Sequence, residues 1–133
     1  MPVDGNRLTQ SALAGIARAT PGLEVLLLFG SRARGDASKA SDWDLGFIAD
    51  DAVDVPTLLG AIVLAVGTDR VDLVDLNRAS GLLRFRAAQD GDTLFESSPG
   101  AADDFRLHAA RFWCDAEPTL RRAYEDLLAE LPA

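Results

Sequence analysis

The feature that most constrains the fold is a short aliphatic run that ends at a glycine. Residues 23–29 are almost entirely apolar, and Gly30 and Ser31 follow them directly. A run of this length, with so little alternation between polar and apolar residues, is typical of a central strand covered on both faces. The glycine behind it allows a ligand to approach the backbone closely. We therefore expect a layered domain whose central strand leads into a loop that carries chemistry.

Helix and strand signals alternate along the rest of the chain. The patterns predict helices over residues 8–19, 57–66 and 79–89, and strands over residues 42–49, 70–76 and 93–96. Residues 101–131 predict one long helix, or two helices separated near Pro118. This alternation indicates an α/β or α+β fold, with a small mixed β-sheet flanked by helices. We expect a single domain over residues 1–133, with its core at about 23–96 and a helical C-terminal segment at about 101–131.

Composition and charge exclude several classes of protein. The net charge of −8 argues against charge-driven binding to nucleic acid. Cys114 is the single cysteine and His108 the single histidine, so the chain offers neither a disulfide scaffold nor a Cys/His zinc site. No segment has the length and apolar character of a membrane span, and the N-terminus does not resemble a signal peptide. We therefore expect a cytoplasmic protein that contacts no membrane and binds no nucleic acid directly.

The turn after residues 23–29 has the properties of an anion-binding site. Ser31 stands where a helix would begin, so free backbone N–H groups, the helix dipole and the serine hydroxyl can together bind a phosphate beside Gly30. Arg32, in the first helical turn, either reaches the same phosphate or is an ordinary surface side chain. For Arg34 we expect a bracing role, in which it pairs with a nearby acid such as Asp36 or Asp42.

Two aspartates on the next predicted strand indicate a metal ion at the same place. Asp42 and Asp44 are two residues apart, so their carboxylates leave the strand on one face, about 7 Å apart at Cα. Trp43 between them points to the opposite face, where we expect it to pack in the core. Mg²⁺ binds carboxylate and phosphate oxygens together, so this pair beside an anion-binding turn predicts a metal-bound polyphosphate.

A third carboxylate would complete a two-metal arrangement and help to deprotonate an attacking hydroxyl. The predicted strand over residues 70–76 offers Asp72 and Asp75, whose side chains leave opposite faces of the strand. We choose Asp72, because it is flanked by apolar residues inside the strand, whereas Asp75 lies near the strand end and can reach solvent or a cap.

These residues together resemble a known family. Gly30 and Ser31, ten further residues and then Asp42 and Asp44 match the GSx10DxD signature of the DNA polymerase β-like nucleotidyltransferases. The surrounding residues look like the minimal (MNT) branch of that family, and the resemblance extends over about residues 26–96. It implies that Gly30 and Ser31 hold the nucleotide phosphates, that Asp42 and Asp44 bind Mg²⁺, and that Asp72 is the third catalytic carboxylate.

The resemblance also implies a reaction and a partner. Many MNT proteins are antitoxins paired with a HEPN-domain ribonuclease toxin, and they transfer AMP from ATP to a tyrosine of that toxin. We therefore expect an ATP- and Mg²⁺-dependent adenylyltransferase with such a partner. Two alternatives stay open: adenylylation of a small hydroxylated molecule, and a non-catalytic antitoxin that neutralises its toxin by binding it. The segment from Ala101 onward is our candidate surface for association with a partner or with a second copy.

Overall fold

The computed structural model describes residues 5–34 and 42–130 of the chain. The helices and strands follow one another in the order α1 (Gly5–Arg18), β1 (Leu23–Phe29), α2 (Ser31–Arg34), β2 (Trp43–Ala49), α3 (Val55–Val66), β3 (Val71–Asp75), α4 (Gly81–Asp90), β4 (Asp92–Glu96) and α5 (Ala101–Glu130). Every predicted helix and strand is present, and β1 has the predicted bounds. Residues 35–41, between α2 and β2, lie outside the described residues.

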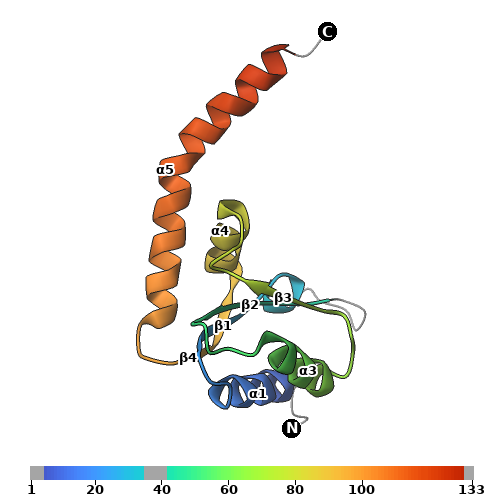
Figure 1. Cartoon of the computed structure of the whole chain (residues 1–133). Helices are drawn as coiled ribbons and strands as arrows, with labels where there is room; N and C mark the ends of the chain where they lie inside the picture. Colours follow the sequence, from blue (N-terminus) through green and yellow to red (C-terminus); the bar gives the residue numbers. More distant parts are fainter. Residues whose placement is uncertain (1–4, 35–41, 131–133) are drawn as a thin grey trace.

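The four strands form one mixed sheet in the order β3-β2-β1-β4. β1 is antiparallel to both of its neighbours, β2 and β4, whereas β2 and β3 run parallel. Helices lie on both sides of this sheet (Figure 1). The predicted fold class, a small mixed sheet flanked by helices, is therefore confirmed.

The core lies in two layers, one on each face of the sheet. On one face, α1 and α3 pack over alternate residues of β1, including Leu26 and Leu28. On the other face, α4 and the beginning of α5 pack over the residues between them, including Val25 and Leu27. All four side chains are at most 1% exposed, and complete burial of such a side chain contributes about 1.5–3 kcal/mol. β1 is thus the doubly covered central strand that its aliphatic sequence predicts.

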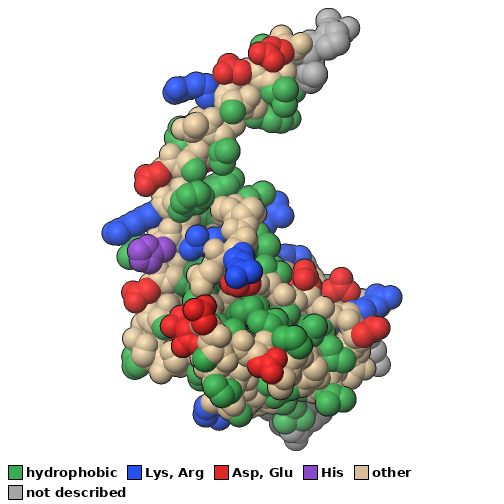
Figure 2. All heavy atoms as spheres, viewed as in Figure 1, with side chains coloured by type: hydrophobic (Ala, Val, Ile, Leu, Met, Phe, Trp, Pro, Cys, Tyr) green, Lys and Arg blue, Asp and Glu red, His purple; other side chains and the backbone are tan. Residues whose placement is uncertain are grey.

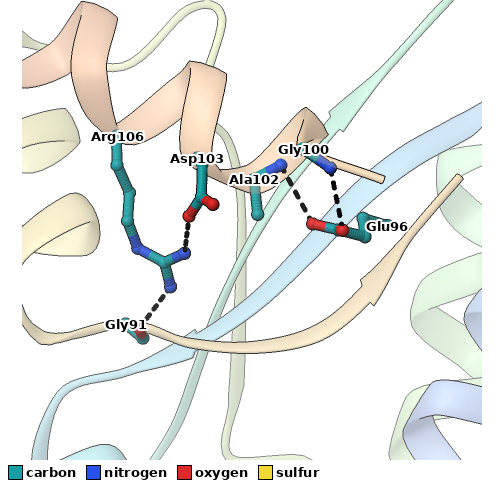
Figure 3. A network of polar contacts seen from close by, with 6 residues as sticks. All are labelled: Gly91, Glu96, Gly100, Ala102, Asp103 and Arg106. Carbon is teal, nitrogen blue, oxygen red and sulfur yellow. Dashed lines mark hydrogen bonds and ion pairs between the residues drawn. The ribbon is translucent and has the colours of Figure 1, made fainter. Parts of the chain in front are cut away.

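The beginning of α5 is fixed to the sheet by polar contacts (Figure 3). The Glu96 carboxylate, at the end of β4, accepts hydrogen bonds from the backbone N–H groups of Gly100 (3.1 Å) and Ala102 (3.2 Å). These N–H groups belong to the helix start, where no intrahelical acceptor exists. The Arg106 guanidinium donates a hydrogen bond of 2.7 Å to the carbonyl oxygen of Gly91. The direction in which α5 leaves the sheet is set by these contacts.

Beyond its first turns, α5 extends away from the sheet and bends about half-way along (Figure 1). It is one continuous helix that contains Pro118, so of the two sequence alternatives the single helix is correct. Its buried residues, Ala102, Phe105 and Ala109, all lie in the first three turns. From residue 118 to residue 130 every side chain is exposed. Within the described residues, no helix is both long enough and apolar enough to cross a membrane.

Candidate active site

Strand pairing places two of the predicted acids side by side. Asp44 is opposite Asp72 in the parallel pairing of β2 with β3, and opposite Phe29 in the antiparallel pairing with β1. Trp43 packs in the core beneath α1 and α3, as predicted, so the Asp44 carboxylate leaves the sheet on the face that α4 covers. The sequence predicts Asp42 inside the strand, but it lies one residue before β2 and is exposed.

These acids line a cavity of about 480 Å³ where β1 ends and β2 and β3 begin. Its lining comes from β1 and the turn behind it, from α2, β2 and β3, and from α4: Phe29, Gly30, Ser31, Arg34, Asp42, Asp44, Asp72, Leu83, Arg86 and Asp90. The volume is in the range of small-ligand pockets. Five of the six residues predicted for the site therefore meet at one cavity.

Gly30 fits closely against one of the carboxylates. Its φ of 74° lies in the left-handed region that glycine adopts without strain. A Cβ atom added at Gly30 would collide with Oδ2 of Asp44. Directly behind it, the Arg34 N–H donates a hydrogen bond of 3.1 Å to the Gly30 carbonyl oxygen and closes the short α2 turn. Glycine is thus required both by the turn and by the position of Asp44.

The charges of neighbouring side chains act on the Asp44 carboxylate. The pKa of Asp44 is raised above its ordinary value, first by burial and then by the negative charges of Asp72 and Asp42. The positive charge of Arg34 acts in the opposite direction and lowers it. Such mutual repulsion is relieved when a cation binds between the carboxylates.

Comparison with known proteins assigns the chain to a family. The family model described as "Polymerase beta, Nucleotidyltransferase" matches residues 12–100, which include every residue that lines the cavity. The chain belongs to this nucleotidyltransferase family. The match confirms the resemblance inferred from the Gly-Ser turn and the aspartate pair.

Individual relatives are consistent with this assignment. A protein adenylyltransferase MntA from Aphanizomenon flos-aquae (strain 2012/KM1/D3) is 34% identical over 99 residues, which span 65% of this chain and 65% of that protein. A solved toxin-antitoxin structure with AMP-PNP contains a chain with a TM-score of 0.76 and 24% identity, over 90% of this chain and 98% of that one. A solved complex of a tri-AMPylated Shewanella oneidensis HEPN toxin with an MNT antitoxin contains a chain with a TM-score of 0.72 and 23% identity. This match covers 92% of the present chain and 98% of that one. The two solved structures show that the nucleotidyltransferase fold is shared.

The donor atoms at this candidate site fit Mg²⁺ held jointly with a nucleotide. Carboxylate oxygens are ligands that a hard divalent ion prefers, and Asp42, Asp44 and Asp72 supply them at one cavity. Among the described residues, no group of three or more acidic, histidine or cysteine side chains is gathered closely enough to hold an ion unaided. Mg²⁺ is usually bound by only one or two carboxylates together with substrate phosphates and water. The arrangement therefore suits an ion that arrives with its nucleotide.

Arg32, proposed as a phosphate ligand, lies elsewhere. Its guanidinium carbon is 4.1 Å from the centroid of the Trp43 ring, on the side of β2 away from Asp44. It does not line the cavity, whereas Arg34 does. The reason is helical geometry: successive residues of α2 point about 100° apart, so the residue after Ser31 turns away from the carboxylates. The Asp36 suggested as a partner of Arg34 lies outside the described residues.

Asp75, the alternative third acid, belongs to a turn. One of its carboxylate oxygens accepts a hydrogen bond of 3.0 Å from the Asn77 N–H, and the other is 3.7 Å from Nε of Arg78. In the pairing with β2 it lies opposite Phe47. The structure therefore brings Asp72 to Asp44 and leaves Asp75 to stabilise the turn after β3.

The sequence did not predict one wall of the cavity, which α4 forms. Leu83, Arg86 and Asp90 of α4 line the same cavity as the three acids. Their spacing, i, i+3 and i+7, puts them on one side of a helix and can be recognised in the sequence. No sequence signal shows that this side of α4 covers the aspartates, because that depends on how α4 packs on the sheet.

Proposed function

We propose that this chain is a Mg²⁺-dependent protein adenylyltransferase that transfers AMP from ATP to a tyrosine hydroxyl of a partner HEPN ribonuclease toxin, and that it acts as the antitoxin of that pair. The observation that carries the proposal is the convergence of Asp42, Asp44 and Asp72 on one cavity beside Gly30. A relative named as a protein adenylyltransferase, and a solved complex of an AMPylated HEPN toxin with an MNT antitoxin, support the same reaction and partner.

The reaction is an in-line displacement at the α-phosphorus of ATP. The tyrosine oxygen forms a bond to that phosphorus, the bond from the phosphorus to the oxygen bridging to the β-phosphate breaks, and pyrophosphate leaves. Gly30 and Ser31 bind the phosphates from the turn after β1. Mg²⁺, held by the aspartates, would offset the negative charge on the attacking and leaving oxygens. Asp72 is exposed beside Asp44, and we assign it to help accept the tyrosine proton.

The outer part of α5, residues 118–130, supports the proposed protein partner. Leu120, Tyr124, Leu127 and Leu128 are between 49% and 61% exposed, and their spacing places them along one side of the helix. Figure 2 shows hydrophobic side chains on this part of the helix, clear of the sheet and its covering helices. Apolar side chains on one helix face are a common means of binding a groove on another protein. We therefore assign this face to the toxin.

The test is transfer of label from α-³²P-ATP. Purified protein, Mg²⁺ and the partner toxin are incubated, and wild type is compared with the Asp42→Ala/Asp44→Ala double variant. A matched control, Asp51→Ala/Asp69→Ala, removes two exposed acids that do not line the cavity. Label on a toxin tyrosine with wild type and control, but not with the site variant, supports the proposal.

Other outcomes favour the alternatives. A stable complex that carries no label with any variant contradicts catalysis and favours an antitoxin that acts by binding alone. Label that accumulates on a small hydroxylated molecule, with none on the toxin, favours the small-molecule adenylyltransferase.

A further inference from the structure

Arg86 of α4 lines the same cavity as the carboxylates, and no described residue is its partner. Arg34 and Arg86 are the two cationic residues among those that line the cavity. Arg34 acts on the Asp44 carboxylate and lowers its pKa. Arg86 is exposed, and within residues 5–34 and 42–130 it forms neither a hydrogen bond nor an ion pair. Its charge is therefore available to a ligand in the cavity.

The position of Arg86 is determined by the packing of α4. Ala87, the next residue, is fully buried against the sheet. On the other side of the helix, Phe85 stacks on Trp113 of α5, with ring centroids 5.6 Å apart. A Cβ atom at Gly81 would collide with the ring of Phe112, so this end of α4 also lies directly against α5. With these sides fixed, the side that carries Arg86 remains over the cavity.

A polyphosphate needs this positive charge. The described lining holds four aspartates, Asp42, Asp44, Asp72 and Asp90, against the two arginines. Mg²⁺ bound at the sheet would offset two of the three negative charges there, but Asp90 lies on α4 and its charge repels any phosphate that extends toward this wall. A guanidinium one helical turn before Asp90 supplies paired N–H donors that match phosphate oxygens.

We propose that Arg86 binds the β- and γ-phosphates of ATP across the cavity from the aspartates, and that it makes the site prefer nucleoside triphosphates to monophosphates. The inference rests on the proposed function, since it assumes that the cavity binds ATP. Gly30 and Ser31 hold the phosphate chain from the sheet side, and Arg86 holds its far end from the helix side. After transfer, the same contact would retain pyrophosphate until it leaves.

The experiment measures nucleotide binding by calorimetry in the presence of Mg²⁺, with the full chain and no toxin. The probes are AMP-PNP, which carries a full chain of three phosphoryl groups, and AMP, which carries the α-phosphate alone. We expect Arg86→Gln to weaken AMP-PNP binding by about tenfold or more and to leave AMP binding within about twofold. Arg86→Lys keeps the charge but loses the paired donors, so its affinity for AMP-PNP should fall between those of wild type and Arg86→Gln.

Arg111→Gln is the matched control, because it removes an exposed arginine of α5 that does not line the cavity. Its affinities should equal those of wild type, and thermal melts should show that all variants are folded. Equal weakening of AMP and AMP-PNP by Arg86→Gln would overturn the inference, and so would unchanged AMP-PNP binding, while the proposed function would stand in both cases. A wild-type chain that binds neither probe would overturn both the inference and the proposed function.

Discussion

The sheet with its covering helices and the outer part of α5 place the same residue type in opposite environments. Leu26 and Leu28 of β1 are fully buried, whereas Leu120 and Leu127 of α5 are 51% and 55% exposed. In Figure 2 the hydrophobic side chains of outer α5 stand apart from the rest of the molecule. The difference does not come from composition, because each pair consists of leucines. It comes from whether another element of the same chain lies within reach.

This contrast separates two tasks. The sheet and its covering helices bury their own core and hold the candidate active site at a fixed geometry. Outer α5 gains little from the rest of the chain, so its apolar face is available to another protein. If the proposed function is right, chemistry and partner binding should be lost independently, and the predictions below test that separation.

The largest effect is expected from a pair of variants, one in each region. Asp44→Asn should reduce AMP transfer by about 10²–10⁴-fold but leave the complex with the toxin unchanged. Leu120→Glu/Leu127→Glu should abolish the complex and leave AMP-PNP binding unchanged, because these residues lie outside the cavity. Label transfer, size-exclusion chromatography and calorimetry measure the three properties. Loss of nucleotide binding in the α5 variant would show that the two regions are coupled.

A second comparison concerns stability. Leu28→Ala should lower the free energy of unfolding by about 2–5 kcal/mol, because it leaves a cavity in the core. Leu127→Ala removes the same atoms from an exposed position and should change it by less than about 0.5 kcal/mol. Urea unfolding of the isolated chain measures both. A similar loss in the two variants would mean that outer α5 packs against something in solution, such as a second copy.

Glycine substitutions sharpen the comparison inside the sheet region. Gly30→Ala should cost about 1–2 kcal/mol of stability, since alanine resists the positive φ, and the new Cβ must displace Asp44. Gly15→Ala, within α1, meets no atom within 4 Å and should stabilise the chain by about 0.5–1 kcal/mol. Thermal melts distinguish the two signs. A neutral Gly30→Ala would contradict the close fit between this turn and the Asp44 carboxylate.

The smallest effect is a dependence on pH. The folded state raises the pKa of Asp44 above its ordinary value of 3.8, so ionisation of this group costs stability as pH rises through that value and beyond. Asp44→Asn should therefore be more stable than wild type at neutral pH and equal to it in acid. The side chain is only partly buried, so solvent screening keeps the gain below about 1 kcal/mol. Thermal melts of both proteins at pH 3 and pH 7 measure this difference in stability. An Asp44→Asn variant that is less stable than wild type at pH 7 would contradict the prediction.

Local sequence rules predicted the elements of the site but not all of its members. Gly30 and Ser31 follow a strand that its aliphatic residues identify, and the spacing of Asp42 and Asp44 relates their side chains through strand geometry alone. The sequence placed Arg32 at the cavity and gave no sign of Arg86 there, and both results have one reason. An arginine side chain is long, so where it lies depends on the neighbours that it meets. The indole of Trp43 lies beneath Arg32, and the wall of the cavity carries Arg86.

The sequence by itself determined the strands, the Gly-Ser turn, the aspartate pair and the family, because each depends on residues that are close together along the chain. Tertiary structure alone decided the sheet order, the pairing that sets Asp72 opposite Asp44, the closure of the cavity by α4 and the continuity of α5 through Pro118. The first three depend on contacts between segments far apart in the sequence. In α5, the missing N–H of Pro118 removes only one hydrogen bond, and the turns on either side of it remain helical.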